Sequence, residues 1–161
     1  MNGTPNIPSP VNEPVLSYAP GSPERATLKA ALELMSADQA DIPAVVGGRE
    51  IRSGRTVNVV APHRHAQVLA TVHQADAATI SAAAASAVEA QRDWATWRFE
   101  DRAAVFLKAA ELLASSHRAI LNAATMLGQS KTAYQAEIDS ACELIDFLRF
   151  NVHFLSNIYS E

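Results

Sequence analysis

The segment from about Thr132 to Asn157 limits the fold most strongly, because its pattern predicts a helix with two apolar faces. When its residues are placed at about 100° each around a helix axis, two separate apolar stripes result. One stripe consists of Tyr134, Ile138, Ala141, Ile145, Leu148 and Val152. The second, on roughly the opposite side, consists of Ala136, Phe147, Phe150 and Phe154. Such a helix must be covered from two directions.

The first residues of the chain are typical of an extended arm. Six of the eight prolines lie in residues 1–23, and proline lacks the N–H group and the conformational freedom that helices and inner strands need. We therefore expect residues 1–21 to form an extended, partly disordered arm rather than a packed element. A helix should follow, because Ser22 can cap it and Pro23 suits its first turn.

A β region comes next, over residues 42–75. The segment is rich in β-branched side chains and is interrupted by Gly47, Gly48, Gly54 and Pro62. This pattern predicts three or four short antiparallel strands joined by tight turns. The strand signal stops at about residue 72.

Three helices are then expected before the long last one, over about residues 76–94, 101–115 and 117–127. Asp76 is a suitable N-cap for the first of them, and Ile80 and Val88 are spaced along it for burial. The third should end at Gly128, because glycine adopts a left-handed cap at the least steric cost.

The number of apolar faces that must be covered indicates that these elements belong to a larger domain. Three helices and a fourth with two apolar faces need a sheet or further helices to bury them, and the strands before residue 73 are too few and too short. We expect an α/β fold in which residues 22–161 are the incomplete N-terminal part of a larger domain. Studied alone, such a piece should be dynamic and partly exposed.

Composition excludes several classes of function. The chain has 161 residues, is 48% hydrophobic and carries a formal charge of -4 with acids and bases scattered along it, so we expect no nucleic-acid partner. No apolar run reaches the roughly 18 residues of a membrane span. The opening MNGTPNIPSPVNEP has neither a secretory nor a mitochondrial leader pattern, and we expect a cytoplasmic protein.

Three features with possible chemistry have ordinary explanations. Cys142 lies mid-helix beside an acid that opposes thiolate formation, so we interpret it as a small buried filler. His63 and His65 supply at most two metal ligands, fewer than zinc needs, and we expect a polar hairpin turn and no metal. The GQSKT segment at 128–132 lacks the first glycine of a phosphate loop, so it should be a turn in which Lys131 is solvated or paired with an acid.

A stripe of acids on the last helix is less ordinary. Asp139, Glu143 and Asp146 are spaced to share one side, where Phe147 and Phe150 follow. No lysine or arginine lies three or four positions from Glu143, and a carboxylate among like charges and aromatic rings is disfavoured on a free helix. The stripe could be a solvated polar strip. The alternative is that Glu143 faces a cleft and meets a cation from a substrate or another segment.

Several stretches together resemble the N-terminal region of one group of enzymes. They are NEPVLSYAPGSPER, IPAVVGGREI, DRAAVFLKAAELL, GQSKT and AEIDSACELIDFLRFN. In this order, over about residues 12–157, they are similar to the L-glutamate γ-semialdehyde dehydrogenases, also called 1-pyrroline-5-carboxylate dehydrogenases, of the aldehyde dehydrogenase superfamily. The chain departs from the usual pattern at Ser130, where glycine is common, and at Ser140 and Cys142, which replace alanines.

The resemblance implies an NAD-dependent oxidation of L-glutamate γ-semialdehyde to glutamate in proline breakdown, by a homo-oligomer when complete. It places the catalytic cysteine, its base and the NAD-binding strands beyond residue 161, so no catalytic or cofactor-binding residue is assigned here and residues 22–161 become an incomplete NAD-binding domain. It assigns Glu143 to the aldehyde site, where that glutamate helps to hold the substrate α-ammonium group. Two alternatives remain, which are a helical interaction module and a sibling aldehyde dehydrogenase with another substrate.

Overall fold

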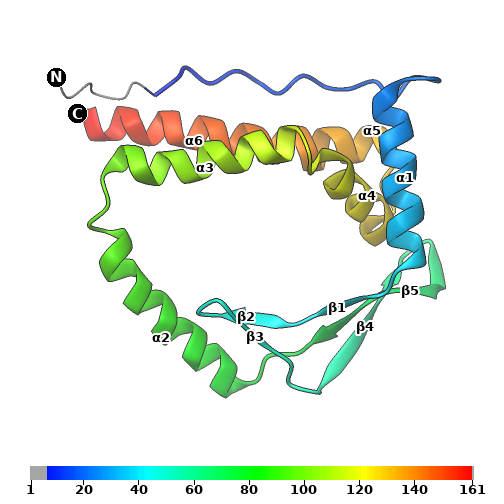
Figure 1. Ribbon diagram of the computed structural model, residues 1–161, viewed down its shortest axis with the longest axis horizontal. Coiled ribbons are helices and arrows are strands. Elements are labelled where there is room, and N and C mark those ends of the chain that lie inside the picture. Colours follow the sequence, from blue (N-terminus) through cyan, green and yellow to red (C-terminus); the bar gives the residue numbers. More distant parts are fainter. Residues whose placement is uncertain (1–6, 161) are drawn as a thin grey trace.

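The computed structural model describes residues 7–160, which form helices and two small sheets (Figure 1). The helices are α1 Pro23–Ala37, α2 Ala77–Trp94, α3 Phe99–Ala114, α4 Arg118–Gln129, α5 Ala133–Ala136, the π-helical turn η1 Glu137–Cys142, and α6 Glu143–Ser160. The strands are β1 Ala40–Ile42, β2 Ala44–Val46, β3 Arg49–Ile51, β4 Thr56–Ala61 and β5 Arg64–His73. Because α5, η1 and α6 are consecutive, they form the long last helix that the sequence predicts.

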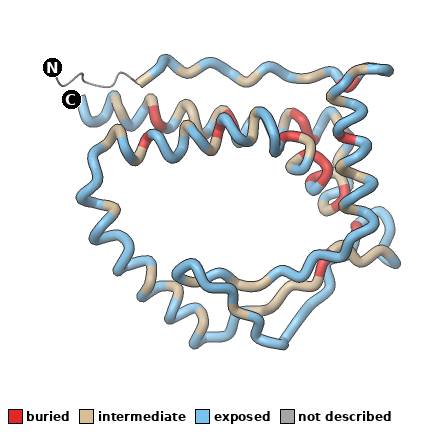
Figure 2. Tube along the Cα trace, in the orientation of Figure 1, coloured by how far each residue is buried: buried red, intermediate tan, exposed pale blue. Residues whose placement is uncertain are grey.

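The elements form an open frame in Figure 1. α6 packs along α3, α1 packs against α4, and the strands lie on the side opposite to α3 and α6. One core cluster joins α1 to α4 through Leu28, Ala123 and Tyr18 of the arm. A second cluster joins α3 to the last helix through Ala110 and Ile145. Buried residues are accordingly concentrated at the junction of α3, α4 and η1 (Figure 2).

The N-terminal arm is packed, which corrects one expectation. Residues 7–19 belong to no helix or strand and run along the outside of α6 toward α1 (Figure 1). However, Tyr18 is only 8% exposed and the backbone N–H of Leu16 donates to the buried Glu137 carboxylate at 2.7 Å. The prediction that the arm is not a packed element is therefore wrong for these residues. Residues 1–6 of the arm lie outside the described residues.

Residues 42–75 contain four strands, β2 to β5, within the predicted number, but β1 comes just before them and makes a parallel pairing that was not predicted. β4 and β5 form the predicted antiparallel hairpin, and β2 and β3 form a second one. β1 instead runs parallel to β5, with Ala40 opposite Ala70. The sequence pattern did not indicate this pairing, because its register depends on the position that the packed helix α1 gives to the residues after it.

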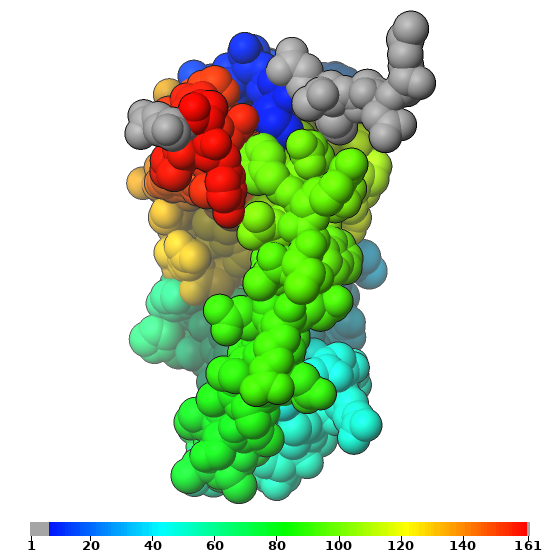
Figure 3. Space-filling view, turned by 90° about the vertical axis from the view of Figure 1, so that its left-hand side faces the viewer, coloured from blue at the N-terminus to red at the C-terminus, as the bar shows by residue number. Residues whose placement is uncertain are grey.

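The caps predicted for α1 and α2 are confirmed. Ser22 accepts a hydrogen bond from the backbone N–H of Arg25 at 3.3 Å, and Asp76 accepts one from that of Thr79 at 2.7 Å. The predicted burial along α2 is wrong, since none of its residues is buried and Ile80 is 61% exposed. In Figure 3 this helix crosses the viewed face beside the β2–β3 hairpin.

The end of α4 also differs from its prediction. Gly128 lies inside the helix, and the left-handed cap is Ser130, with φ 57° and ψ 28°. Gln129 is the last helical residue. A serine therefore occupies the conformation that glycine adopts without strain.

Candidate functional site

A groove of about 570 Å³ lies between the arm and the last helix. The arm contributes Asn12, Glu13 and Val15. The opposite wall consists of Ile138, Cys142, Glu143, Asp146, Phe147, Phe150, Asn151 and Phe154. The structure thus brings together the predicted site residue, Glu143, and the phenylalanines that follow it in the sequence. The groove offers acidic groups beside aromatic surface, a combination suited to an organic cation.

The helix that carries Glu143 begins at a capping box. The Thr132 side chain accepts from the backbone N–H of Gln135, and the Gln135 side chain accepts from that of Thr132 at 2.9 Å. One turn later, residues 137–142 adopt π-helical pitch. A π turn holds one residue more than an α turn, so it rotates the helix before the turn relative to the helix after it.

The π turn explains why two stripe predictions are wrong. Ala136, placed in the second apolar stripe with Phe147 and Phe154, is fully buried, whereas those two phenylalanines are more than half exposed. Asp139, placed beside Glu143, does not line the groove and pairs with Lys131 at 3.0 Å. That ion pair confirms the acid partner allowed for Lys131.

Glu143 is exposed at the start of α6, and within residues 7–160 its carboxylate has no ion-pair or hydrogen-bond partner. The other two carboxylates of the groove are engaged. Asp146 accepts from the Asn12 side-chain amide and from the Glu13 backbone N–H, each at 2.7 Å. Glu13 pairs with Arg118 and with Arg149. Glu143 therefore remains available to a ligand cation.

A buried polar network lies behind the groove and centres on Glu137, which is fully buried in η1. Its carboxylate accepts hydrogen bonds from Arg118, from the Tyr18 hydroxyl at 2.8 Å and from the Asn122 amide at 2.8 Å. It also accepts from the backbone N–H of Leu16 at 2.7 Å. These donors satisfy a charge whose burial is otherwise costly.

Arg118 connects this network to the arm. Its guanidinium, on α4, forms ion pairs with both Glu137 and Glu13 and donates to the backbone carbonyl of Pro14 at 2.7 Å. The second carboxylate oxygen of Glu13 pairs with Arg149 of α6 at 2.7 Å. One carboxylate of the arm thus bridges two helices.

The network shifts the pKa of its members. Burial opposes ionisation of Glu137, but hydrogen bonds from Arg118, Leu16 and Tyr18 together hold its pKa below the ordinary value. Burial and the Glu137 carboxylate raise the pKa of Tyr18 to about 12. Burial and the charge of Glu137 also raise the pKa of Cys142 to about 11, and the thiol is buried, as predicted.

Sequence reasoning did not single out Glu137 or Arg118, although one signal was present. Glu137 lies four residues before Ala141 and eight before Ile145, which belong to the buried stripe. An acid at a core position on a helix indicates a buried cation partner. Nothing in the local pattern around Arg118 identifies that partner, because the pair forms only when α4 packs against η1.

The histidine pair lies at the hairpin of β4 and β5, with His63 in the turn, as expected for a polar hairpin. The His63 ring is 2.9 Å from the Ser130 hydroxyl, and His65 is the second residue of β5. Among residues 7–160, no three histidine, cysteine or acidic side chains are grouped to hold a metal ion.

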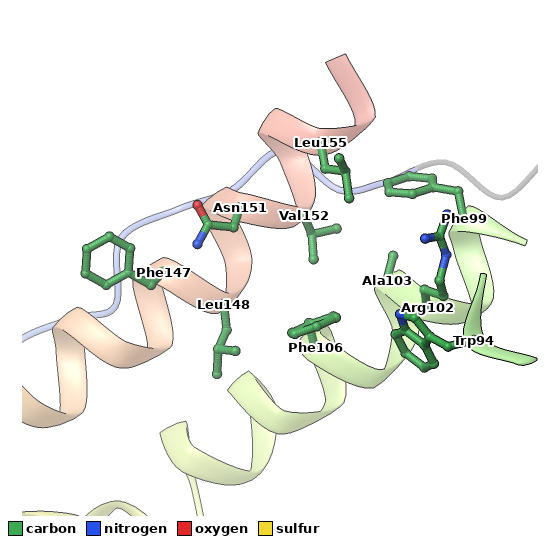
Figure 4. A pocket seen from close by; sticks show the side chains of 10 residues that line it. All are labelled: Trp94, Phe99, Arg102, Ala103, Phe106, Phe147, Leu148, Asn151, Val152 and Leu155. Atoms are coloured by element: carbon green, nitrogen blue, oxygen red, sulfur yellow. The ribbon is translucent and has the colours of Figure 1, made fainter. Parts of the chain in front are cut away.

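A second cavity, of about 310 Å³, lies between α3 and α6 (Figure 4). It is lined mainly by apolar side chains, including Trp94, Phe106, Val152 and Leu155. Arg102 lies at its edge and donates to the Tyr159 hydroxyl at 3.2 Å. Phe147 borders both this cavity and the Glu143 groove.

Comparisons with known proteins identify the family. The sequence profile of the aldehyde dehydrogenase family matches residues 50–161. The chain belongs to the aldehyde dehydrogenase family. Among curated aldehyde dehydrogenases, the mitochondrial delta-1-pyrroline-5-carboxylate dehydrogenase of Dictyostelium discoideum is 49% identical over 156 residues, which are 97% of this chain and 28% of that protein.

Solved aldehyde dehydrogenase structures agree with the arrangement seen here. The delta-pyrroline-5-carboxylate dehydrogenase of Mycobacterium tuberculosis, bound with NAD and cobalamin, superposes with a TM-score of 0.96 at 50% identity, covering 100% of this chain and 30% of that one. The NAD-bound Thermus 1-pyrroline-5-carboxylate dehydrogenase gives a TM-score of 0.81 at 26% identity, covering 95% and 28%. The predicted fold class, part of an aldehyde dehydrogenase fold without its main sheet, is confirmed. This aldehyde dehydrogenase chain spans less than a third of the length of these relatives.

The described residues do not fit the phosphates of NAD. A dinucleotide is held at a glycine-rich turn between a strand and a helix, whereas Gly47 and Gly48 form the tip of the β2–β3 hairpin. Gly54 lies between β3 and β4. None of the helices among residues 7–160 is both long and apolar enough to cross a membrane.

Proposed function

We propose that the chain is the N-terminal segment of an NAD-dependent L-glutamate γ-semialdehyde dehydrogenase, which oxidises the semialdehyde to L-glutamate in proline degradation. The 49% and 50% identities to proteins named as pyrroline-5-carboxylate dehydrogenases support the substrate class. In the complete enzyme NAD accepts the hydride. The segment itself holds neither a nucleophile nor a dinucleotide site among its described residues, so on its own it is inactive.

The chemical role of this segment is to bind one end of the substrate. The Glu143 carboxylate has no partner within residues 7–160 and lines a groove with aromatic walls, and the substrate carries an α-ammonium group. A carboxylate and an ammonium group form a charge-assisted hydrogen bond, which is stronger in a partly desolvated groove. Glu143 therefore orients the amino acid end and leaves the aldehyde to groups elsewhere in the enzyme.

A chimera tests the role of Glu143. Residues 1–161 replace the corresponding segment of the Mycobacterium tuberculosis enzyme, which is 50% identical over this region. Two substrates are compared, L-glutamate γ-semialdehyde and glutarate semialdehyde, which lacks only the α-amino group. Glu143→Gln should raise KM for the first by about 10-fold, because glutamine keeps the acceptor oxygen but loses the negative charge that strengthens the hydrogen bond, and should leave KM for the second unchanged.

The matched control is Glu111→Gln, because Glu111 is an exposed acid paired only with Lys108 among the described residues. It should leave both KM values unchanged. An equal rise of both KM values with Glu143→Gln would remove Glu143 from recognition of the ammonium group. It would favour the sibling enzyme with another aldehyde substrate.

Three further expectations belong to this proposal. The division into an arm of residues 1–21 and an incomplete NAD-binding domain of residues 22–161 stays a prediction, as does a homo-oligomeric complete enzyme. A cytoplasmic location also stays a prediction, and the Dictyostelium relative is named as mitochondrial. Fluorescent tagging of the gene product in its source cell tests the location.

A further inference from the structure

The arm contacts both the groove and the buried network. Asn12 and Glu13 line the groove that holds Glu143. Further along the arm, the Leu16 N–H and the Tyr18 hydroxyl reach the buried Glu137 carboxylate, at 2.7 and 2.8 Å. Displacement of the arm would therefore change the groove and the network together.

Hydrogen bonds and ion pairs fix the arm where it lines the groove. Asp146 accepts two hydrogen bonds from it, and Glu13 links Arg118 on α4 to Arg149 on α6. The side chains of Glu13 and Arg118 are 9% and 8% exposed. A charge that is this well buried is displaced only at a large cost, because its partner would be left unpaired. These hydrogen bonds and ion pairs therefore hold the arm more firmly than exposed contacts would.

The comparisons distinguish the arm from the segment that matches the aldehyde dehydrogenase family profile. The aldehyde dehydrogenase profile matches residues 50–161 and so does not include the arm. The Dictyostelium relative aligns over 156 of the 161 residues and therefore includes residues 12–18 wherever the alignment ends. The arm therefore has a counterpart in the Dictyostelium relative, whose name specifies one substrate.

We propose that residues 12–18, clamped by the ion pair of Glu137 with Arg118, are a specificity element that forms the second wall of the Glu143 groove. This inference rests on the proposed function of Glu143. Glu137 and Arg118 are positioning residues, because they act on the substrate through the arm and do not line the groove. By holding Asn12 and Glu13 opposite Glu143, they set the width of the site that receives the α-ammonium group.

The test uses the chimera described above with two variants of the network. Glu137→Gln removes the buried charge at constant shape, and Tyr18→Phe removes one donor and preserves packing if the first variant does not fold. For each variant, KM and kcat are measured with L-glutamate γ-semialdehyde and with glutarate semialdehyde. Hydrogen exchange of the Leu16 and Glu13 amides, which are bonded to Glu137 and Asp146, reports whether the arm has detached.

We expect faster exchange of both amides and a KM for L-glutamate γ-semialdehyde raised by about 10-fold, the lower end for a lost bond to a charged group. The KM for glutarate semialdehyde and both kcat values should stay within about twofold of the parent. Faster exchange without a selective rise in KM overturns the inference, as does an equal loss with both substrates. If Glu143→Gln is selective and these variants are not, only this inference fails, whereas a non-selective Glu143→Gln refutes the proposed function itself.

Discussion

Arg118 and Glu137 form an ion pair whose side chains are 8% and 0% exposed, between α4 and the π turn of the last helix. Tyr18, Asn122 and the Leu16 N–H complete the hydrogen bonding of the carboxylate. A buried pair is a modest source of stability while intact, but removal of one partner leaves an uncompensated charge. The junction of arm, α4 and last helix is therefore sensitive to either residue.

Glu137→Ala should weaken this junction strongly. The variant leaves the Arg118 guanidinium buried with Glu13 as its one remaining carboxylate partner in the described chain, so we expect a loss of about 3 to 5 kcal/mol in the local opening free energy. Amide exchange of α4 in the chimera measures it. Glu111→Ala, which removes an exposed ion pair, should cost less than about 1 kcal/mol. Equal losses for the two variants would contradict the assigned importance of the buried pair.

The junction should weaken in acid. The pKa of Glu137 is depressed in the folded chain, so its contribution is fully present above the ordinary glutamate value of about 4.5 and is lost as pH falls through the lower folded value. Protection of the Leu16 amide, corrected for intrinsic exchange, should therefore be constant from pH 7 to 5 and decline below about pH 4.5. Glu137→Gln should flatten that decline, and an unchanged decline would assign it to other groups.

Cys142 should be unreactive at mild pH. Its pKa is raised to about 11 by burial and by the Glu137 charge, which reduces the thiolate that attacks electrophiles. At pH 8, alkylation by iodoacetamide should be slower than for a free cysteine by on the order of 100-fold. Peptide mass spectrometry follows the modification, with the urea-denatured chain as the reactive control. Alkylation of the folded chain at the denatured rate would contradict the buried assignment.

Local sequence signals predicted the helices and strands well, but they did not predict which distant segments pair with one another. Ser22 and Asp76 identified two helix starts because an N-cap acts within one turn. The parallel pairing of β1 with β5 and the pair of Arg118 with Glu137 join segments 19 or more residues apart, so no short pattern encodes them. Glu143 was placed correctly beside Phe147 because both follow the π turn, whereas Asp139 was misplaced because it lies inside it.

The left-handed cap of α4 offers a last prediction. Ser130 has a φ of 57°, a region that costs a residue with a Cβ about 1 to 2 kcal/mol. Ser130→Gly should remove this strain and raise the melting temperature of the chimera, although it loses the exposed contact with His63. The matched control is Ser81→Gly, since Ser81 is an exposed residue within α2 whose right-handed helical backbone has no such strain to lose. Glycine there should instead destabilise by roughly 0.5 to 1 kcal/mol through the entropy of the unfolded chain. If both variants lower the melting temperature equally, the Ser130 backbone carries no strain that glycine relieves, and the prediction is wrong.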